Sequence, residues 1–176
     1  MIDIRLLPAG TDSSVIAGLV ALTNAAYRVA EKGLWVEGTD RTDTADMTKL
    51  VQAGEIVAAC DAGGRIRGSM RLFRLDSGEA DFGMLAVDPE ARGAGVGRAL
   101  IGFAERWAVD NSLDVLQLEL LWPREWTHPE KAFLREWYTR IGFELTRVDD
   151  FSADYPSLST RLATPCDLLI FHKSVR

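Results

Sequence analysis

The segment 87–100 has residue types suited to binding a phosphate group. A strand-like apolar run ends there, glycines alternate with other residues, and a helical pattern begins at Val96. Glycine lets backbone N–H groups approach an anion, and the first turn of a helix adds unpaired N–H donors and partial positive charge. We therefore predict a pyrophosphate site whose cradle consists of Arg92, Gly93, Ala94, Gly95, Val96, Gly97 and Arg98.

Two common phosphate-binding motifs do not fit this segment. The G-x-G-x-x-G motif of dinucleotide-binding proteins fails because Arg98 stands where the third glycine is needed, and the Gly-Lys-Ser/Thr of the P-loop is absent. The pattern that fits is Arg-x-x-Gly-x-Gly, formed by Arg92, Gly95 and Gly97. On its own, this pattern also fits a glycine-rich turn that binds nothing.

A second motif, Tyr-x-x-x-Gly-Phe, begins at Tyr138 on a predicted helix. A phenol can donate a proton to a leaving group, although Tyr138 could instead pack in the apolar stripe beside Leu134. The two motifs, in this order and on these elements, resemble those of the GNAT acyltransferase superfamily. The resemblance covers roughly residues 55–145.

The resemblance implies an enzyme that transfers an acetyl group from acetyl-CoA to a primary amine, by direct attack in a ternary complex. The glycine-rich turn would hold the CoA pyrophosphate, the backbone of Leu85, Ala86 and Val87 would bind the pantetheine arm, and Tyr138 would act as general acid. One N–H near Leu85 would face the thioester oxygen. The alternative is a non-catalytic acyl-CoA sensor or interaction module of the same fold.

The acceptor amine must lose a proton before it attacks, because a free alkylamine has a pKa near ~10. A carboxylate, or a water held by one, can accept that proton. Asp81 and Glu119 lie on predicted strands, and Gln117 shares a strand face with Glu119. Both acids are candidate bases, and a solvated or salt-bridged carboxylate remains the alternative for each.

The acceptor pocket is expected around the first helix and the loop that follows it. Tyr27, Glu31 and Trp35 could form an aromatic and acidic wall for a cationic amine, and Trp122 could close the cleft from the far side. Core tryptophans and solvated charges are the alternatives. His128 is a lone histidine without ligand partners nearby in the sequence, so we expect no metal site.

The hydrophobic pattern predicts an α/β (mixed α+β) fold with a central, mostly antiparallel sheet of about seven strands, flanked by about four helices. Glycine-containing turns at 63–64 and 76–78 predict hairpins. The expected strands are 2–7, 55–61, 65–74, 79–87, 114–121, 143–149 and 164–173, and the expected helices start near 12, 44, 96 and 127.

Composition limits the remaining possibilities. A length of 176 residues with no linker-like stretch favours one acyl-CoA N-acyltransferase domain over 1–176, and a net charge of −6 disfavours nucleic acid as a partner. No apolar run reaches the ~18 residues of a membrane span. Two cysteines are too few for a disulfide framework, so we expect a cytoplasmic protein. Proteins of the superfamily that this sequence resembles are often dimers, so the resemblance allows a homodimer.

Overall fold

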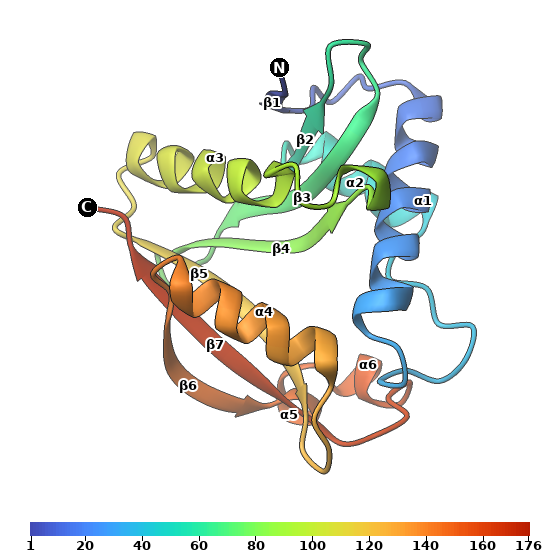
Figure 1. The fold of residues 1–176 in the computed structure, drawn as a ribbon, viewed down its shortest axis with the longest axis vertical. Helices are drawn as coiled ribbons and strands as arrows, with labels where there is room; N and C mark the ends of the chain where they lie inside the picture. The colour runs from blue at the N-terminus through green and yellow to red at the C-terminus, as the bar shows by residue number, and fades with distance from the viewer.

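Seven strands, each an apolar or alternating run of residues, form one sheet in the computed structural model, which describes residues 1–176 (Figure 1). The order across the sheet is β1-β2-β3-β4-β5-β7-β6, and every neighbouring pair is antiparallel except β4 and β5. The predicted mixed, mostly antiparallel sheet is therefore confirmed. The strands are β1 (Asp3–Leu6), β2 (Ile56–Cys60), β3 (Ile66–Arg74), β4 (Ala80–Val87), β5 (Val115–Pro123), β6 (Glu144–Asp150) and β7 (Cys166–Ser174).

Four longer helices cover the sheet, as predicted. They are α1 (Ser13–Ala30), α2 (Thr44–Gln52), α3 (Val96–Asp110) and α4 (Pro129–Arg140). Along β2, Val57 and Ala59 belong to the hydrophobic cluster that includes α3 and α4, whereas Ile56 and Ala58 belong to the one that includes α1 and α2. Because successive strand residues point to opposite faces, α3 and α4 cover one face of the sheet and α1 and α2 cover the other.

The parallel pair β4 and β5 is joined over a very short distance. Only Ala80 with Leu116 and Asp81 with Gln117 are in register, and Figure 1 shows the two strands diverging beyond that point. Farther along β4 the pairing with β3 shifts in register, and Met84 there has a φ of 53°. A bulge of this kind bends a strand and increases its twist. The backbone of β4 after Asp81 consequently has no strand partner on the β5 side.

Some local predictions were wrong. Thr127 and Glu130 have the spacing of a capping box, which would start the helix near 127, but α4 begins at Pro129 and no side chain caps its first turn. Phe133, whose apolar side chain and spacing on α4 favour burial, is 56% exposed. Three short elements were not predicted, namely a 3₁₀ turn η1 (Pro89–Ala91) and the helices α5 (Phe151–Asp154) and α6 (Pro156–Ser159).

Helix α1 is long and apolar enough to cross a membrane, judged by length and composition alone. A helix that packs on a protein core passes the same test. The buried residues Ile16 and Leu19 of α1 pack in one cluster with α2 and β2. The expectation that the chain has no membrane span therefore stays a prediction.

Gly68 on β3 allows α3 to approach the sheet closely. A Cβ added at Gly68 would lie 2.8 Å from Cγ1 of Val96 and 3.1 Å from the carbonyl oxygen of Ala86. Val96 is the first residue of α3, so this contact sets the distance between the start of the helix and the strand before it. Only glycine fits there without moving the helix.

We predict that Gly68→Ala destabilises the protein by about 1–3 kcal/mol, because overpacking forces α3 away from the sheet. Urea unfolding measures the change. Gly18→Ala on α1 is the matched control, since its added Cβ meets nothing within 4 Å, and it should be neutral or stabilising. Equal unfolding free energies for Gly68→Ala and the wild type would contradict the close-packing argument.

Candidate active site

The glycine-rich turn presents a group of free backbone donors. Gly93 and Gly95 have φ values of 79° and 80°, a region that favours glycine, and Gly95 is the cap of α3. Two amides of the turn are used internally, because Arg92 N donates to Pro89 O (3.3 Å) and Ala94 N donates to Ala91 O (3.1 Å). The N–H groups without a backbone acceptor are those of Gly93, Gly95, Val96, Gly97 and Arg98.

The charges around this turn leave a net positive surface. Arg92 and Arg98 are exposed, make no ion pair within the chain, and have no acidic residue beside them in the first turn of α3. An anion could therefore meet both guanidinium groups without displacing an internal partner.

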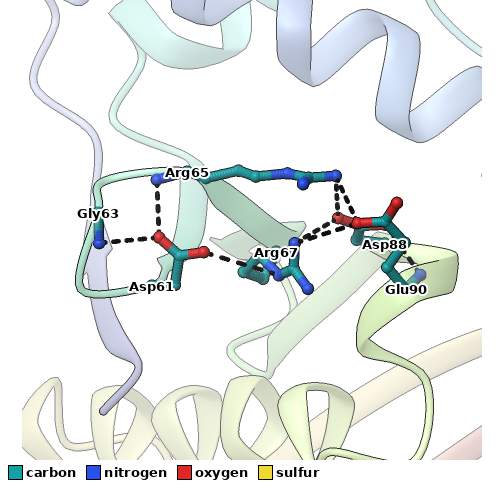
Figure 2. Close-up of polar contacts among 6 residues, drawn as sticks. All are labelled: Asp61, Gly63, Arg65, Arg67, Asp88 and Glu90. Carbon is teal, nitrogen blue, oxygen red and sulfur yellow. Dashed lines mark hydrogen bonds and ion pairs between the residues drawn. The ribbon is translucent and has the colours of Figure 1, made fainter.

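The acids that precede the turn are already paired, as Figure 2 shows. Asp88 lies 3.0 Å from an Arg65 nitrogen and 3.1 Å from an Arg67 nitrogen, and Glu90 lies 3.0 Å from Arg65. Asp88 also accepts a hydrogen bond from the backbone N–H of Glu90 (3.0 Å), and its own N–H donates to Arg67 O (2.9 Å). The network ties the end of β4 to β3, so it fixes the start of the turn and neutralises the nearby carboxylates.

A cavity of about 1190 Å³ opens where β4 and β5 part. Its walls come from α1, the α1–α2 loop, β3, β4, β5, α4 and the α5–α6 segment. The sequence-predicted site residues that line it are Tyr27, Glu31, Trp35, Asp81, Leu85, Glu119 and Tyr138. The structure therefore brings together both candidate bases, the candidate acid and most of the predicted acceptor wall.

Asp81 is a buried carboxyl group, with 6% of its surface exposed, in the stretch where the two strands still pair. Burial raises its pKa to about 7, a hydrogen bond from Gln117 Nε2 (2.9 Å) opposes that rise, and nearby Glu119 adds to it. Gln117 Oε1 in turn lies 2.7 Å from His172 Nε2 on β7. An ionised Asp81 can only accept, so Gln117 must present its NH₂ group to Asp81 and its oxygen to an N–H of His172.

Glu119 is the second carboxylate of the cavity, and it is held by a residue that was not predicted. The Tyr155 hydroxyl donates to Glu119 Oε2 (2.7 Å), and the Tyr155 ring stacks on Phe151 at a centroid distance of 5.2 Å. Burial and the Glu119 charge both raise the pKa of Tyr155. The α5–α6 segment is thus anchored to β5 at the edge of the cavity.

Tyr138 is both packed and in contact with the cavity. Its ring lies among Trp137, Phe82 and Phe143, at centroid distances of 5.1, 6.1 and 5.8 Å, and its side chain also lines the cavity with Leu85. Burial raises the pKa of Tyr138, and the neighbouring Tyr27 phenol adds to the rise. The phenol therefore stays protonated over the range in which an enzyme works, as a proton donor must.

The predicted acidic wall has a different charge from the one expected. Glu31 lines the cavity, but Lys131 Nζ lies 2.7 Å from its carboxylate and Trp35 Nε1 donates to it at 2.5 Å. The pair is buried, so Glu31 has little free charge to offer a cation. Trp122 does not line the cavity; the guanidinium of Arg135 lies over its ring at 5.2 Å, and it packs on the main core.

Two residues of the site were not predicted from the sequence, and each of them contacts a residue distant in the chain. His172 lies opposite Gln117 in the β5–β7 register, and Tyr155 belongs to a segment with no strong helical pattern. Alternation along β5 did indicate that Gln117 and Glu119 share a polar face. Pairing the predicted strands 114–121 and 164–173 in the observed register would have placed His172 beside Gln117.

Comparisons with known proteins identify the family and the fold of the chain. A family model described as an acetyltransferase (GNAT) domain matches residues 52–145, just over half of the chain. No curated protein matches. A GNAT-family acetyltransferase structure from Desulfovibrio desulfuricans aligns over 100% of both chains, with 18% identity and a TM-score of 0.69.

Two further solved structures share the fold, the first over its whole length and the second over part of it. One from Staphylococcus aureus, described as a GNAT-family acetyltransferase, aligns over 100% of both chains with 17% identity and a TM-score of 0.66. A streptothricin acetyltransferase structure from Bacillus anthracis, solved with acetyl coenzyme A, aligns over 68% of this chain and 61% of its own, with 19% identity and a TM-score of 0.53. Identities this low show a shared fold alone, whereas the family model shows membership: the chain belongs to the GNAT family of acetyltransferases.

Proposed function

We propose that the protein transfers an acetyl group from acetyl-CoA to a primary amine, by direct attack while both substrates are bound. The observation that carries this proposal is the group of free N–H donors at Gly93 and from Gly95 to Arg98, beside the unpaired charges of Arg92 and Arg98. That donor set fits a pyrophosphate, because it combines backbone donors at a helix N-terminus with two guanidinium groups. The Bacillus anthracis structure, solved with acetyl coenzyme A, supports the choice of ligand.

Acetyl-CoA would supply the activated acetyl thioester. From Phe82 to Val87, the backbone groups of β4 that point away from β3 have no strand partner. They offer N–H groups for the pantetheine arm and, near Leu85, for the thioester oxygen. The bulge at Met84 interrupts the pairing with β3 in the same stretch.

The two sides of the cavity offer opposite proton chemistry. Asp81, with a pKa of about 7, is suited to take a proton from the acceptor ammonium, directly or through a water, at neutral pH. Tyr138, held neutral by burial, is suited to donate a proton to the departing thiolate. We propose Asp81 as the general base and Tyr138 as the general acid, with the Glu119 carboxylate adding attraction for a cationic amine.

We predict that Tyr138→Phe lowers kcat by roughly 10²-fold, because the variant keeps the ring packing and loses only the proton donor. Steady-state release of free thiol from acetyl-CoA measures the rate, and calorimetry with CoA is the control. Binding of CoA should be unchanged. A kcat equal to that of the wild type would remove Tyr138 from the mechanism.

We predict that Asp81→Asn loses at least about 10²-fold in kcat but gains stability above neutral pH. Asp81 is protonated up to about pH 7 in the folded chain and ionises near its ordinary pKa of 3.8 when unfolded. The wild-type free energy of unfolding therefore falls between these two pH values, and the variant avoids this loss, which is on the order of 2 kcal/mol or more by pH 8.

Urea unfolding at pH 4 and pH 8 tests the second part of that expectation. The advantage of Asp81→Asn should be present at pH 8 and absent at pH 4. Asp110→Asn, at an exposed position outside the cavity, is the control for loss of one negative charge. An advantage of equal size at both pH values would contradict a raised Asp81 pKa, and full activity would move the base to Glu119 or elsewhere.

We predict that Gly95→Val abolishes acetyl-CoA binding in calorimetry, because valine is strained at a φ of 80° and shifts the N–H groups of the turn. Gly54→Val carries the matched strain, at a φ of 71° and with open space around its Cβ, but it follows α2, away from the turn. It should lose similar stability and keep normal binding. Normal binding by a folded Gly95→Val protein would contradict the proposed cradle.

A further inference from the structure

The loop between α1 and α2 is fixed at one point by a buried side chain. Asn24 on α1 accepts hydrogen bonds at Oδ1 from the backbone N–H groups of Arg41 (2.9 Å) and Thr42 (3.0 Å), and its Nδ2 donates to Thr42 O (2.9 Å). Asn24 and Thr42 are both buried, so these bonds are shielded from water. The backbone of Arg41 is therefore held in place, although the loop around it has no regular structure.

From this fixed point, the side chain of Arg41 reaches the cavity. Its guanidinium lies 5.3 Å from the centroid of the Tyr27 ring, and both residues line the cavity wall. Burial raises the pKa of Tyr27, and the adjacent Arg41 charge opposes that rise. Tyr27 also lies against the backbone of Met84 and beside the Tyr138 phenol. Arg41 is thus one aromatic ring away from the bulge of β4.

Arg41 has no carboxylate partner, unlike three of the other basic residues that line the cavity. Arg28 pairs with Asp40 (2.8 Å), and Lys131 pairs with Glu31 (2.7 Å). Arg71 on β3 likewise pairs with Glu55 (2.7 Å). The cavity therefore has a guanidinium without a carboxylate partner on its loop side, and the carboxylates of Asp81 and Glu119 on its sheet side.

Such an arrangement matches a ligand with charges of both signs. A guanidinium forms paired hydrogen bonds with a carboxylate, and a carboxylate attracts an ammonium group. We propose that the acceptor is an amine with a carboxylate next to it, of the α-amino acid class, and that Arg41 binds this carboxylate while the amine faces Asp81. The inference rests on the proposed function and deepens it, because it names the chemical class of the acceptor.

The test compares acceptors that differ only in the carboxylate. Thiol release from acetyl-CoA is measured with a panel of α-amino acids and with the carboxamide and decarboxylated amine of each. The carboxamides lose their ammonium proton more easily, so a preference for the acids cannot arise from amine basicity. We expect kcat/KM to be at least tenfold higher for one or more acids than for the matched carboxamide.

Variants assign that preference to one residue. Arg41→Gln should reduce the acid-to-carboxamide ratio of kcat/KM by about tenfold or more. Arg41→Lys should restore part of that ratio, because lysine returns the positive charge without the planar group that forms paired hydrogen bonds. Arg161→Gln is the matched control, because Arg161 also lines the cavity and has no ion pair within the chain. Its ratio should equal that of the wild type.

The outcomes separate this inference from the proposed function. Turnover of the amines or carboxamides without any preference for the acids would overturn the role of Arg41 and leave acetyl transfer standing. An acid preference that survives in Arg41→Gln and disappears in Arg161→Gln would also overturn it. Absence of thiol release with every amine, in a protein that still binds acetyl-CoA, would overturn the proposed function and this inference with it.

Discussion

The site depends on the parting of β4 and β5. Two parallel strands that paired along their whole length would use their backbone groups on each other and leave no room between them. Here the pairing stops after Asp81 and Gln117, and the bulge at Met84 turns β4 away. The gap provides both requirements of a two-substrate enzyme, namely unpaired main-chain donors and a cavity that reaches the middle of the sheet. Close packing of α3 at Gly68 and the ionic network at Asp88 hold the end of β4 in that position.

Charge compensation divides the molecule into inert and available groups. Glu31, Asp88 and Glu90 all have basic partners, and these acids therefore contribute to position more than to binding. Arg92, Arg98 and Arg41 have none, and they lie at the turn and in the cavity. Asp81 is a third kind of group, because burial has changed its proton affinity without giving it a cationic partner. The free charges, more than the total charge of the chain, indicate what the protein can bind.

Much of the fold was predictable from sequence because it depends on local patterns. Each strand run, each pair of hairpin glycines and the Arg-x-x-Gly-x-Gly turn is encoded by residues close together in the chain. The family model covers the hairpins and the turn, but not the first and last strands. The site was predictable only in part. Asp81, Glu119 and Tyr138 were chosen as candidates by residue type and position, and all three line the cavity. The compensation of Glu31 by Lys131, by contrast, joins residues 100 positions apart. His172 and Tyr155 likewise meet Gln117 and Glu119 only after β7 and α5–α6 fold onto β5. No local pattern reports such contacts.

The chain of hydrogen bonds from Asp81 through Gln117 to His172 has a consequence for turnover. A side-chain amide neither gains nor loses a proton under ordinary conditions, so Gln117 separates the two titratable groups that it connects. If Asp81 is the base, as proposed, a proton that it accepts has no conducting route through the sheet towards β7. It must leave on the cavity side, through water or with the departing product. Regeneration of the base would then be tied to reopening of the cavity, which makes product exit and proton exit parts of one event.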